Sequence, residues 1–301
     1  MVLFLGARYD CAESTYGIAE FSEDLARADN LPAPEKYHHV AELLSRLTGE
    51  IAYIEEFIRK IFHARDPNQV VDGYGDTSLL LGGTEQFSFR MVKWLPDKQV
   101  PLPEHEREGL AYDLLHNHDF NLITKGIHGD GYETDVYRFD ASTIVGAYDE
   151  PVAMAYQGRF KLSPGSVMWY EQYNDVHTQI SPRGFSLSFN VIPKDRALRH
   201  SQFIFDRSTS RIKEFTRNGT ARTLSLLNLL CDFDAGDETR ELVVDLGQST
   251  ANLWLKMSIA AFVSERWSID RREVWDSFEI PERYSRALDI PADHFSVRRI
   301  R

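Results

Sequence analysis

The sequence is poor in cysteine: 2 occur in 301 residues, Cys11 and Cys231, and no CxxC pair is present. This pattern gives no disulfide framework and no cysteine-ligated zinc site, and it fits the reducing cytoplasm, where we expect the protein. Long apolar runs are missing too. The stretch MVLFLGARYD is too short for a signal peptide, and no segment approaches the roughly 20 apolar residues of a membrane span.

Positive charge is also scarce, with 34 Lys and Arg against 46 Asp and Glu and a formal net charge of -12. Binding to nucleic acid or to an anionic membrane depends on clustered basic side chains. We therefore expect neither partner. The 43% of hydrophobic residues, in contrast, can build a sizeable globular core.

The period of the apolar residues changes along the chain. Between Pro34 and Arg65 it is three and four residues, which predicts one or two amphipathic helices. Between about Val71 and Pro193, short aromatic and β-branched runs separated by Gly, Pro and Asp predict antiparallel strands. The runs are SLLLGG, FSFRMVKWL, YETDVYRF, VAMAYQGRFKL, SVMWYEQ and FSLSFNVI.

The C-terminal third returns to the helical period. After a strand at QFIFD, the segments ARTLSLLNLLCDF and STANLWLKMSIAAFVSERW both predict helices. The second is apolar on most of its circumference, so we expect it to be buried against the barrel or across a subunit interface. The order predicts a mainly β protein with flanking helices: an N-terminal helical segment at 1–69, a β-barrel at 70–207 and a C-terminal helical segment at 208–301.

Three histidines in the strand-rich region form a candidate metal site. On a strand, His116 and His118 would share one face because alternate side chains point the same way. His177 follows in a hairpin that begins at the turn Pro164-Gly165. Two residues of one strand and a third from a neighbouring hairpin can hold one face of a metal ion inside a small barrel. Neutral imidazoles suit Fe, Cu, Zn, Ni or Mn, and iron is favoured when substrate and dioxygen must both bind.

The region from about Tyr74 to Pro193 resembles the cupin-type thiol dioxygenases, the cysteine dioxygenase and mercaptopropionate dioxygenase group. The resemblance rests on the HxH pair, on GYETDVYRFD and on NDVHTQISP followed by FSLSFNV. Where ordinary cupins carry a Glu ligand, this chain has Leu122 and Ile123. The resemblance therefore implies a cupin-like double-stranded β-helix, or jelly roll, that binds Fe(II) through His116, His118 and His177.

The chain departs from this group in its proton relay. Ser186, Ser188 and Asn190 stand where the group carries Ser, His and Tyr. The carboxylate-binding arginine of the group would fall near Asp76, and no cysteine lies near the barrel for a Cys-Tyr crosslink. We therefore expect the fold and the metal site of the group without its thiol oxidation. The resemblance covers less than half of the chain.

Other functions stay open at this point. His128 and Asp130 match the HxD of a 2-oxoglutarate oxygenase, with His177 as distal ligand and Arg183 as carboxylate partner. Against this set, HGDG favours a tight turn. A metal-dependent cupin isomerase or decarboxylase would need no dioxygen. A ligand-binding or regulatory cupin would need no turnover at the metal.

Tyr173 and Arg90 are the candidate substrate contacts. Alternation places Arg90 opposite Phe89 and Met91, either in the cavity, where it would meet a substrate carboxylate, or on the solvent face. The function that we predict is a mononuclear non-heme Fe(II)-dependent oxygenase acting on a small polar metabolite, similar to an amino or hydroxy acid. Its partners would be this substrate and O2, and the sequence also allows a homo-oligomer.

Overall fold

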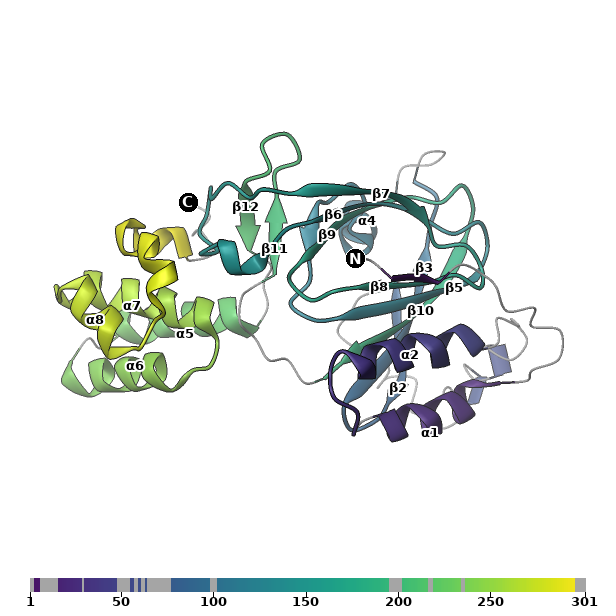
Figure 1. Cartoon of the computed structure of the whole chain (residues 1–301), viewed down its shortest axis with the longest axis horizontal. Helices are drawn as coiled ribbons and strands as arrows, with labels where there is room; N and C mark the ends of the chain where they lie inside the picture. The colour runs from purple at the N-terminus through teal and green to yellow at the C-terminus, as the bar shows by residue number, and fades with distance from the viewer. Residues whose placement is uncertain are drawn as a thin grey trace. The chain divides into compact units, whose positions relative to one another are not determined.

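The computed structural model describes residues 3–5, 16–28, 30–47, 55–56, 59–60, 63, 77–97, 102–194, 202–215, 219–233 and 236–295. Two compact units are built from non-consecutive segments of the chain (Figure 1). The first unit comprises Met1–Leu114, Phe120–Tyr137 and Tyr156–Arg196, and the second comprises Leu115–Asp119, Arg138–Ala155 and Ala197–Arg301. The domain boundaries expected after residues 69 and 207 stay a prediction.

The described strands form two six-stranded sheets, with the orders β1-β8-β5-β10-β3-β2 and β12-β11-β4-β9-β6-β7. The strand pairs whose register is described are antiparallel. Together with the flanking helices, these sheets confirm the predicted mainly β class. The strands are β1 Leu3–Leu5, β2 Ser78–Gly83, β3 Phe87–Trp94, β4 His116–Asn117, β5 Leu122–His128, β6 Glu133–Arg138, β7 Ala155–Lys161, β8 Val167–Tyr170, β9 Asp175–Ile180, β10 Ser186–Pro193, β11 Phe203–Phe205 and β12 Ile212–Phe215.

Each of the six predicted runs contains a strand, and QFIFD contains β11. The strand β5, in contrast, was not among the predicted runs. Six of its seven residues are buried, as in the pattern BBBBBBe, so it lacks the polar alternation of a half-buried strand. The expected strand at the HxH pair is shorter than predicted, because β4 ends at Asn117 and His118 lies just beyond it.

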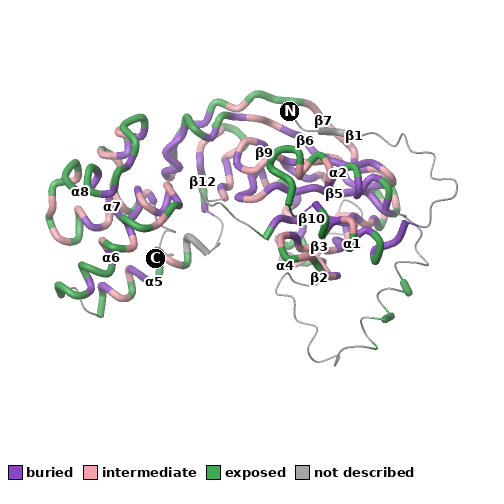
Figure 2. The backbone as a smooth tube through the Cα atoms, turned by 60° about the horizontal axis from the view of Figure 1, so that its bottom comes forward, coloured by how far each residue is buried: buried purple, intermediate pink, exposed green. Residues whose placement is uncertain are grey.

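The first sheet has two faces of different chemistry. Its register places Phe189 of β10 beside Met91 and Lys125, and Asn190 beside Arg90 and Thr124. Because successive side chains point to opposite faces, Phe189 and Asn190 belong to different layers. We call the side of Asn190 the lumen face. Figure 2 shows β5 and β10 as mostly buried stretches, which agrees with a sheet that is covered on both faces.

The side of Phe189 packs against two N-terminal helices, α1 Ile18–Ala28 and α2 Glu35–Arg46. The rings of Phe21 and Phe189 meet edge to face, with centroids 5.7 Å apart. Lys125 reaches the end of α2, where its Nζ donates hydrogen bonds to the carbonyl oxygens of Ser45 at 2.8 Å and Leu47 at 2.5 Å. The apolar cluster on this side includes Phe21, Leu25, Val40, Leu44, Phe87, Phe89, Met91, Ile123, Val167, Phe189 and Val191.

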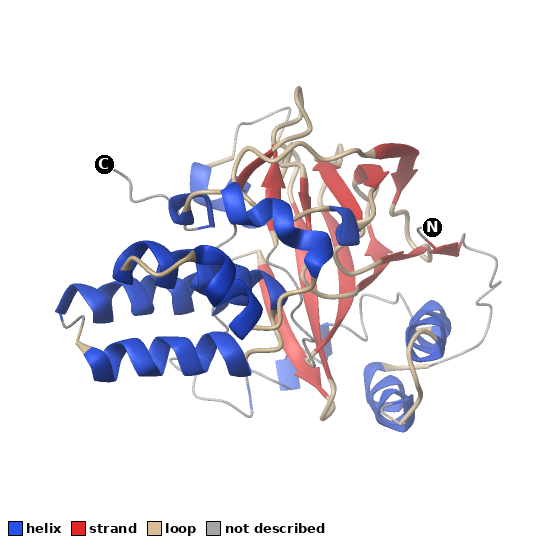
Figure 3. Cartoon of the chain, turned by 60° about the vertical axis from the view of Figure 1, so that its left-hand side comes forward, coloured by secondary structure: helices blue, strands red, loops and turns tan. Residues whose placement is uncertain are grey.

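The second unit is mainly helical beyond residue 218 (Figure 3). Its central helix is α7 Leu253–Trp267, which contacts α5, α6, α8 and η4. Trp254 and Ile259 are fully buried there, so the predicted helix and its burial are confirmed. The neighbours that bury it are the helices just named and Phe215 of β12, whose ring centroid lies 5.2 Å from that of Trp254. Further helices are α4 Glu104–Leu110, α5 Gly219–Phe233, α6 Asp237–Ser249 and α8 Arg271–Ser277, with 3-10 turns η2 Ala141–Thr143, η3 Glu282–Asp289 and η4 Ala292–Phe295. Among the described residues, no helix has the length and apolar character needed to cross a membrane.

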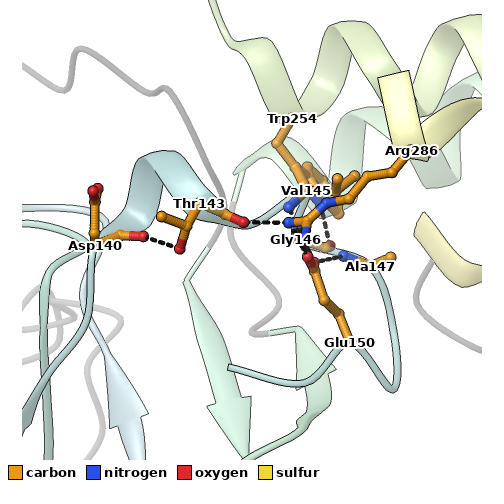
Figure 4. A network of polar contacts seen from close by, with 8 residues as sticks. All are labelled: Asp140, Thr143, Val145, Gly146, Ala147, Glu150, Trp254 and Arg286. Atoms are coloured by element: carbon orange, nitrogen blue, oxygen red, sulfur yellow. Dashed lines mark hydrogen bonds and ion pairs between the residues drawn. The ribbon is translucent and has the colours of Figure 1, made fainter. Parts of the chain in front are cut away.

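A buried carboxylate ties the loop after η2 to the helical part of the second unit (Figure 4). Glu150 accepts hydrogen bonds from the backbone N–H groups of Val145 at 2.9 Å, Gly146 at 2.6 Å and Ala147 at 3.1 Å. Arg286 of η3 donates to the same carboxylate and to the carbonyl of Thr143. Trp254 Nε1 of α7 donates to the carbonyl of Gly146 at 2.7 Å. The loop is thereby held from two helical segments.

We expect Glu150→Gln to lower the free energy of unfolding of the second unit by about 2 kcal/mol, because charge-assisted hydrogen bonds are lost while the side chain keeps its size. Urea unfolding followed by circular dichroism measures the change. The control is Asp149→Asn, which alters an exposed carboxylate at the next position. Equal stabilities of Glu150→Gln and Asp149→Asn would contradict the role assigned to Glu150.

Candidate metal centre

The three predicted histidines come together in the second sheet, where β4 and β9 are neighbours. His116 lies in β4, His118 follows its end and His177 lies in β9. All three are buried, with exposed fractions of 4%, 8% and 0%. One ring nitrogen from each lies within 4.8 Å of the others. Within the described ranges, this is the one group of three or more His, Cys, Asp or Glu residues placed closely enough to hold an ion.

The donor chemistry fits a divalent transition metal. The rings of His116 and His118 are nearly perpendicular, at 88°, with centroids 5.0 Å apart, as expected for side chains on one face of an extended segment. No carboxylate belongs to the group. Imidazole nitrogens bind Zn, Cu, Fe and Ni well, whereas Mg and Ca prefer oxygen ligands. The structure therefore supports a three-His site for a divalent transition metal.

Tyr170 of β8 lies against the third histidine, with its ring centroid 4.2 Å from that of His177. Its hydroxyl donates a hydrogen bond to Met168 Sδ at 3.4 Å and also contacts Tyr132. Burial raises the pKa of Tyr170 to about 12, and the hydrogen bond with Tyr132 opposes that rise. Burial also raises the pKa of Tyr132 well above its usual range. Both phenols are therefore neutral at physiological pH.

A hydrogen-bonded polar network continues along the lumen face. Trp94 Nε1 donates to Ser188 Oγ at 2.9 Å, and Ser188 Oγ donates to Asn190 Oδ1 at 3.2 Å. Thr124 Oγ1 donates to the same Asn190 oxygen at 2.6 Å. The ring of Trp94 lies 4.2 Å from that of Tyr132, between centroids. The lumen thus contains hydroxyl, amide and indole groups that are paired with one another.

The structure places the two candidate substrate contacts differently. Arg90 lies opposite Asn190 in the register, so it belongs to the lumen face, and its Nε is buried. The sequence left two placements open for Arg90, in the cavity or on the solvent face, and the register supports the first. Tyr173 lies in the turn between β8 and β9, buried and with a left-handed backbone at φ 64°. The substrate roles of both residues stay predictions.

The ligand set of a 2-oxoglutarate oxygenase is not favoured. His128 and Asp130 are exposed and do not belong to the buried histidine group. Asp130 lies in a turn between Gly129 and Gly131, whose φ angles of 83° and 77° favour glycine. Lys161 forms an ion pair with Asp130 at 2.5 Å and lowers the pKa of its carboxyl. HGDG is therefore a surface turn, and its aspartate pairs with a lysine.

Sequence reasoning did not single out Tyr132, Tyr170 or Trp94. A signal was present in SVMWYEQ, where alternation separates Trp169 from Tyr170. It could not say which of the two faces the lumen, because that depends on the pairing of Tyr170 with Leu122 of β5. The missing information was the register between strands.

Comparison with family models and with curated proteins finds no match. Among solved structures, the chain is similar to the DMSP lyase DddQ from Ruegeria pomeroyi DSS-3, with 11% identity over 42% of this chain and 49% of that chain, at a TM-score of 0.22. It is also similar to hydroquinone 1,2-dioxygenase from Sphingomonas sp. TTNP3, with 7% identity over 42% of this chain and 70% of that chain, at a TM-score of 0.27. The chain is similar as well to the polyketide cyclase RemF from Streptomyces resistomycificus, with 10% identity over 40% of this chain and 65% of that chain, at a TM-score of 0.23.

The chain spans about half to two thirds of most of these structures, for example 52% of a DMSP lyase chain and 63% of a hydroquinone dioxygenase chain. Similarity at these scores gives no information on substrate or reaction. The chemistry of the site therefore has to come from the residues of this chain.

We expect the free energy of unfolding to fall as the pH rises above about 10, the usual pKa of tyrosine in an unfolded chain. Tyr132 keeps its proton in the folded state while the unfolded chain loses it, so ionisation favours unfolding. The fall should be smaller in Tyr132→Phe. Urea unfolding between about pH 8 and pH 11 measures the slope. The same substitution at Tyr137, in the same strand-forming segment but half-buried, should leave the slope unchanged. Identical slopes in all three proteins would contradict the prediction.

Proposed function

We propose that the chain is a mononuclear non-heme Fe(II)-dependent oxygenase that oxidises a small polar metabolite, similar to an amino or hydroxy acid, with dioxygen. The observation that carries the proposal is the group of three buried histidines, with ligand nitrogens within 4.8 Å of one another and no carboxylate among them. The resemblance of the region from about Tyr74 to Pro193 to the three-His thiol dioxygenases supports iron as the metal.

His116, His118 and His177 would hold the ion, which when bound supplies a Lewis acid and a site for dioxygen. Because the three ligands are neutral, they leave the 2+ charge uncompensated. Such a site attracts an anionic, chelating substrate more strongly than a site with a carboxylate ligand does. This favours a substrate with a carboxylate beside an amino or hydroxyl group.

The lumen face supplies groups that suit this substrate. The guanidinium of Arg90 would bind the substrate carboxylate, ideally through two parallel hydrogen bonds. The phenols of Tyr170 and Tyr132 keep their protons at neutral pH and can donate to a substrate oxygen. Apolar neighbours on this face, including Met168 and Ile192, keep water away from the reacting groups.

Thiol oxidation is not part of the proposal. Two of the positions that hold the relay in thiol dioxygenases are Ser188 and Asn190, and both take part in hydrogen bonds with Trp94 or Thr124. Neither side chain can transfer a proton as histidine or tyrosine does near neutral pH. We therefore propose C–H, C–C or heteroatom oxidation of the metabolite and little turnover of cysteine.

The metal site is tested by metal analysis of variants reconstituted with Fe(II) without oxygen. His177→Ala should lose most of its iron, because two remaining imidazoles bind a divalent ion weakly. His128→Ala should keep its iron, since His128 is an exposed histidine outside the group. Both ligand sets contain His177, so His116→Ala distinguishes them. Loss of iron in Asp130→Ala, with full occupancy in His116→Ala, would replace the three-His site by the 2-oxoglutarate ligand set.

The reaction class is tested by titrating the Fe(II) protein with candidate amino and hydroxy acids, with nitric oxide in place of dioxygen. A substrate that chelates the iron should enhance the iron-nitrosyl signal in electron paramagnetic resonance spectra. In Arg90→Met, the dissociation constant of that acid should rise by about tenfold or more, with iron content unchanged. Product formation without oxygen would indicate a non-oxidative isomerase or decarboxylase, and robust cysteine oxidation would contradict the proposed substrate class.

A further inference from the structure

The helix α5 is apolar on two opposite faces. One face is buried and includes Leu224, Leu227 and Cys231, on a helix that contacts α6 and α7. The other face carries Leu226, Leu229 and Phe233, which are 65%, 48% and 81% exposed. At 100° per residue, the two sets point in nearly opposite directions. A helix that is apolar on two sides normally has a partner on each.

The exposed residues Leu226, Leu229 and Phe233, which we call the α5 stripe, have the spacing of a helix–helix seam. They are separated by three and four residues, which is the spacing of the a and d positions of a coiled coil. Single exposed apolar residues are common on protein surfaces, whereas an aligned row of large ones marks an interaction site. The spacing indicates that the partner is itself a helix.

The charges at the ends of the α5 stripe indicate which helix the partner contributes. Arg222 lies four residues before Leu226 on the same face, and Asp232 adjoins Phe233 at the other end; both are exposed. The segment from 223 to 231 contains no charged side chain. The helix therefore presents a positive end, an apolar middle and a negative end. A copy of this helix in the antiparallel direction matches each of these parts.

We propose that α5 pairs antiparallel with α5 of a second copy of the chain, about a two-fold axis, to form a homodimer. With the axis between Leu226 and Leu229, Leu226 lies opposite the partner's Leu229. Arg222 then lies near the partner's Asp232 and Phe233, and the symmetry repeats each contact. The antiparallel arrangement also places the positive end of each helix dipole near the negative end of the other.

A second copy fits better than an unrelated protein for two reasons. A two-fold interface must be self-complementary, and the order of Arg222, the apolar residues and Asp232 has this property. The chain also carries a net charge of -12, so two copies repel each other over most surfaces. The uncharged α5 stripe with one charge of each sign is a place where this repulsion is small.

The interface is small, because it consists mainly of one helix from each copy. Interfaces below about 1,200 Å² belong to the weak class, so we expect a dissociation constant of about 1 to 100 µM. Sedimentation equilibrium over this range of concentration should show a reversible monomer–dimer equilibrium. The double variant Leu226→Glu, Leu229→Glu should raise the dissociation constant by about tenfold or more. The control Leu242→Glu, which changes a leucine 56% exposed on α6, should not.

Charge reversal tests the antiparallel arrangement itself. Arg222→Glu places like charges at both ends of the seam, and so does Asp232→Arg, so each variant alone should dimerise less. An equimolar mixture of the two variants restores opposite charges at both ends and should form a mixed dimer. The double variant Arg222→Glu, Asp232→Arg should likewise recover the dimer. Weaker dimerisation of each single variant than of the unchanged protein identifies an antiparallel contact between two copies of α5. A parallel contact would already bring Arg222 against Arg222, and neither substitution would add a repulsive pair.

Three results would overturn the proposal. A monomer at all concentrations would contradict it, and so would a dimer that is insensitive to the α5 stripe variants. Loss of folding in the Glu variants, seen as a lower melting temperature than that of Leu242→Glu, would instead show that the α5 stripe is covered within its own chain. Iron content is measured in the same variants. The proposed dimer does not depend on the metal site, so variants that lose the dimer should still bind iron as the unchanged protein does.

Discussion

The register of β10 between β3 and β5 is the constraint on which the first unit depends. It sends Phe189 to the helix side and Ser188 and Asn190 to the lumen face. A slip by one residue would place Asn190 in the apolar cluster and a phenyl ring beside Thr124. Each buried polar group without a partner costs about 1 to 3 kcal/mol, so this polar network stabilises one register against its neighbours.

The same constraint extends from the core to the metal centre. β5 pairs with β10 on one side and with β8 on the other, and its Leu122 lies opposite Tyr170. The position of Tyr170 against His177 therefore depends on two successive strand pairings. The second sheet brings the histidines together, and the first sheet places the ring of Tyr170 against that of His177. Packing of the core and geometry of the site are set by the same hydrogen-bonded strands.

The strands and the site residues differ in how well the sequence predicts them. β3 and β10 were predictable because apolar residues alternate with polar ones, and the HxH pair was informative because two residues on one strand share a face. β5 was not predicted, because burial on both of its faces removes the alternation of polar and apolar residues. Lys125 shows the same limit: a lysine suggests a solvent-facing position, yet it is 3% exposed and donates to two carbonyls at the end of α2. Its burial depends on a helix about 80 residues earlier in the chain.

The proton donors on the lumen face show why the sequence of one strand predicts only part of a site. A relay on a single strand is visible in sequence, since alternate residues face the same way, and Ser186, Ser188 and Asn190 show that this relay is absent. Phenols from two different segments, Tyr132 and Tyr170, nevertheless meet beside His177. Burial keeps both of them protonated. The absence of one family's relay therefore excludes that relay alone, while the lumen still contains proton donors that only the pairing of strands brings together.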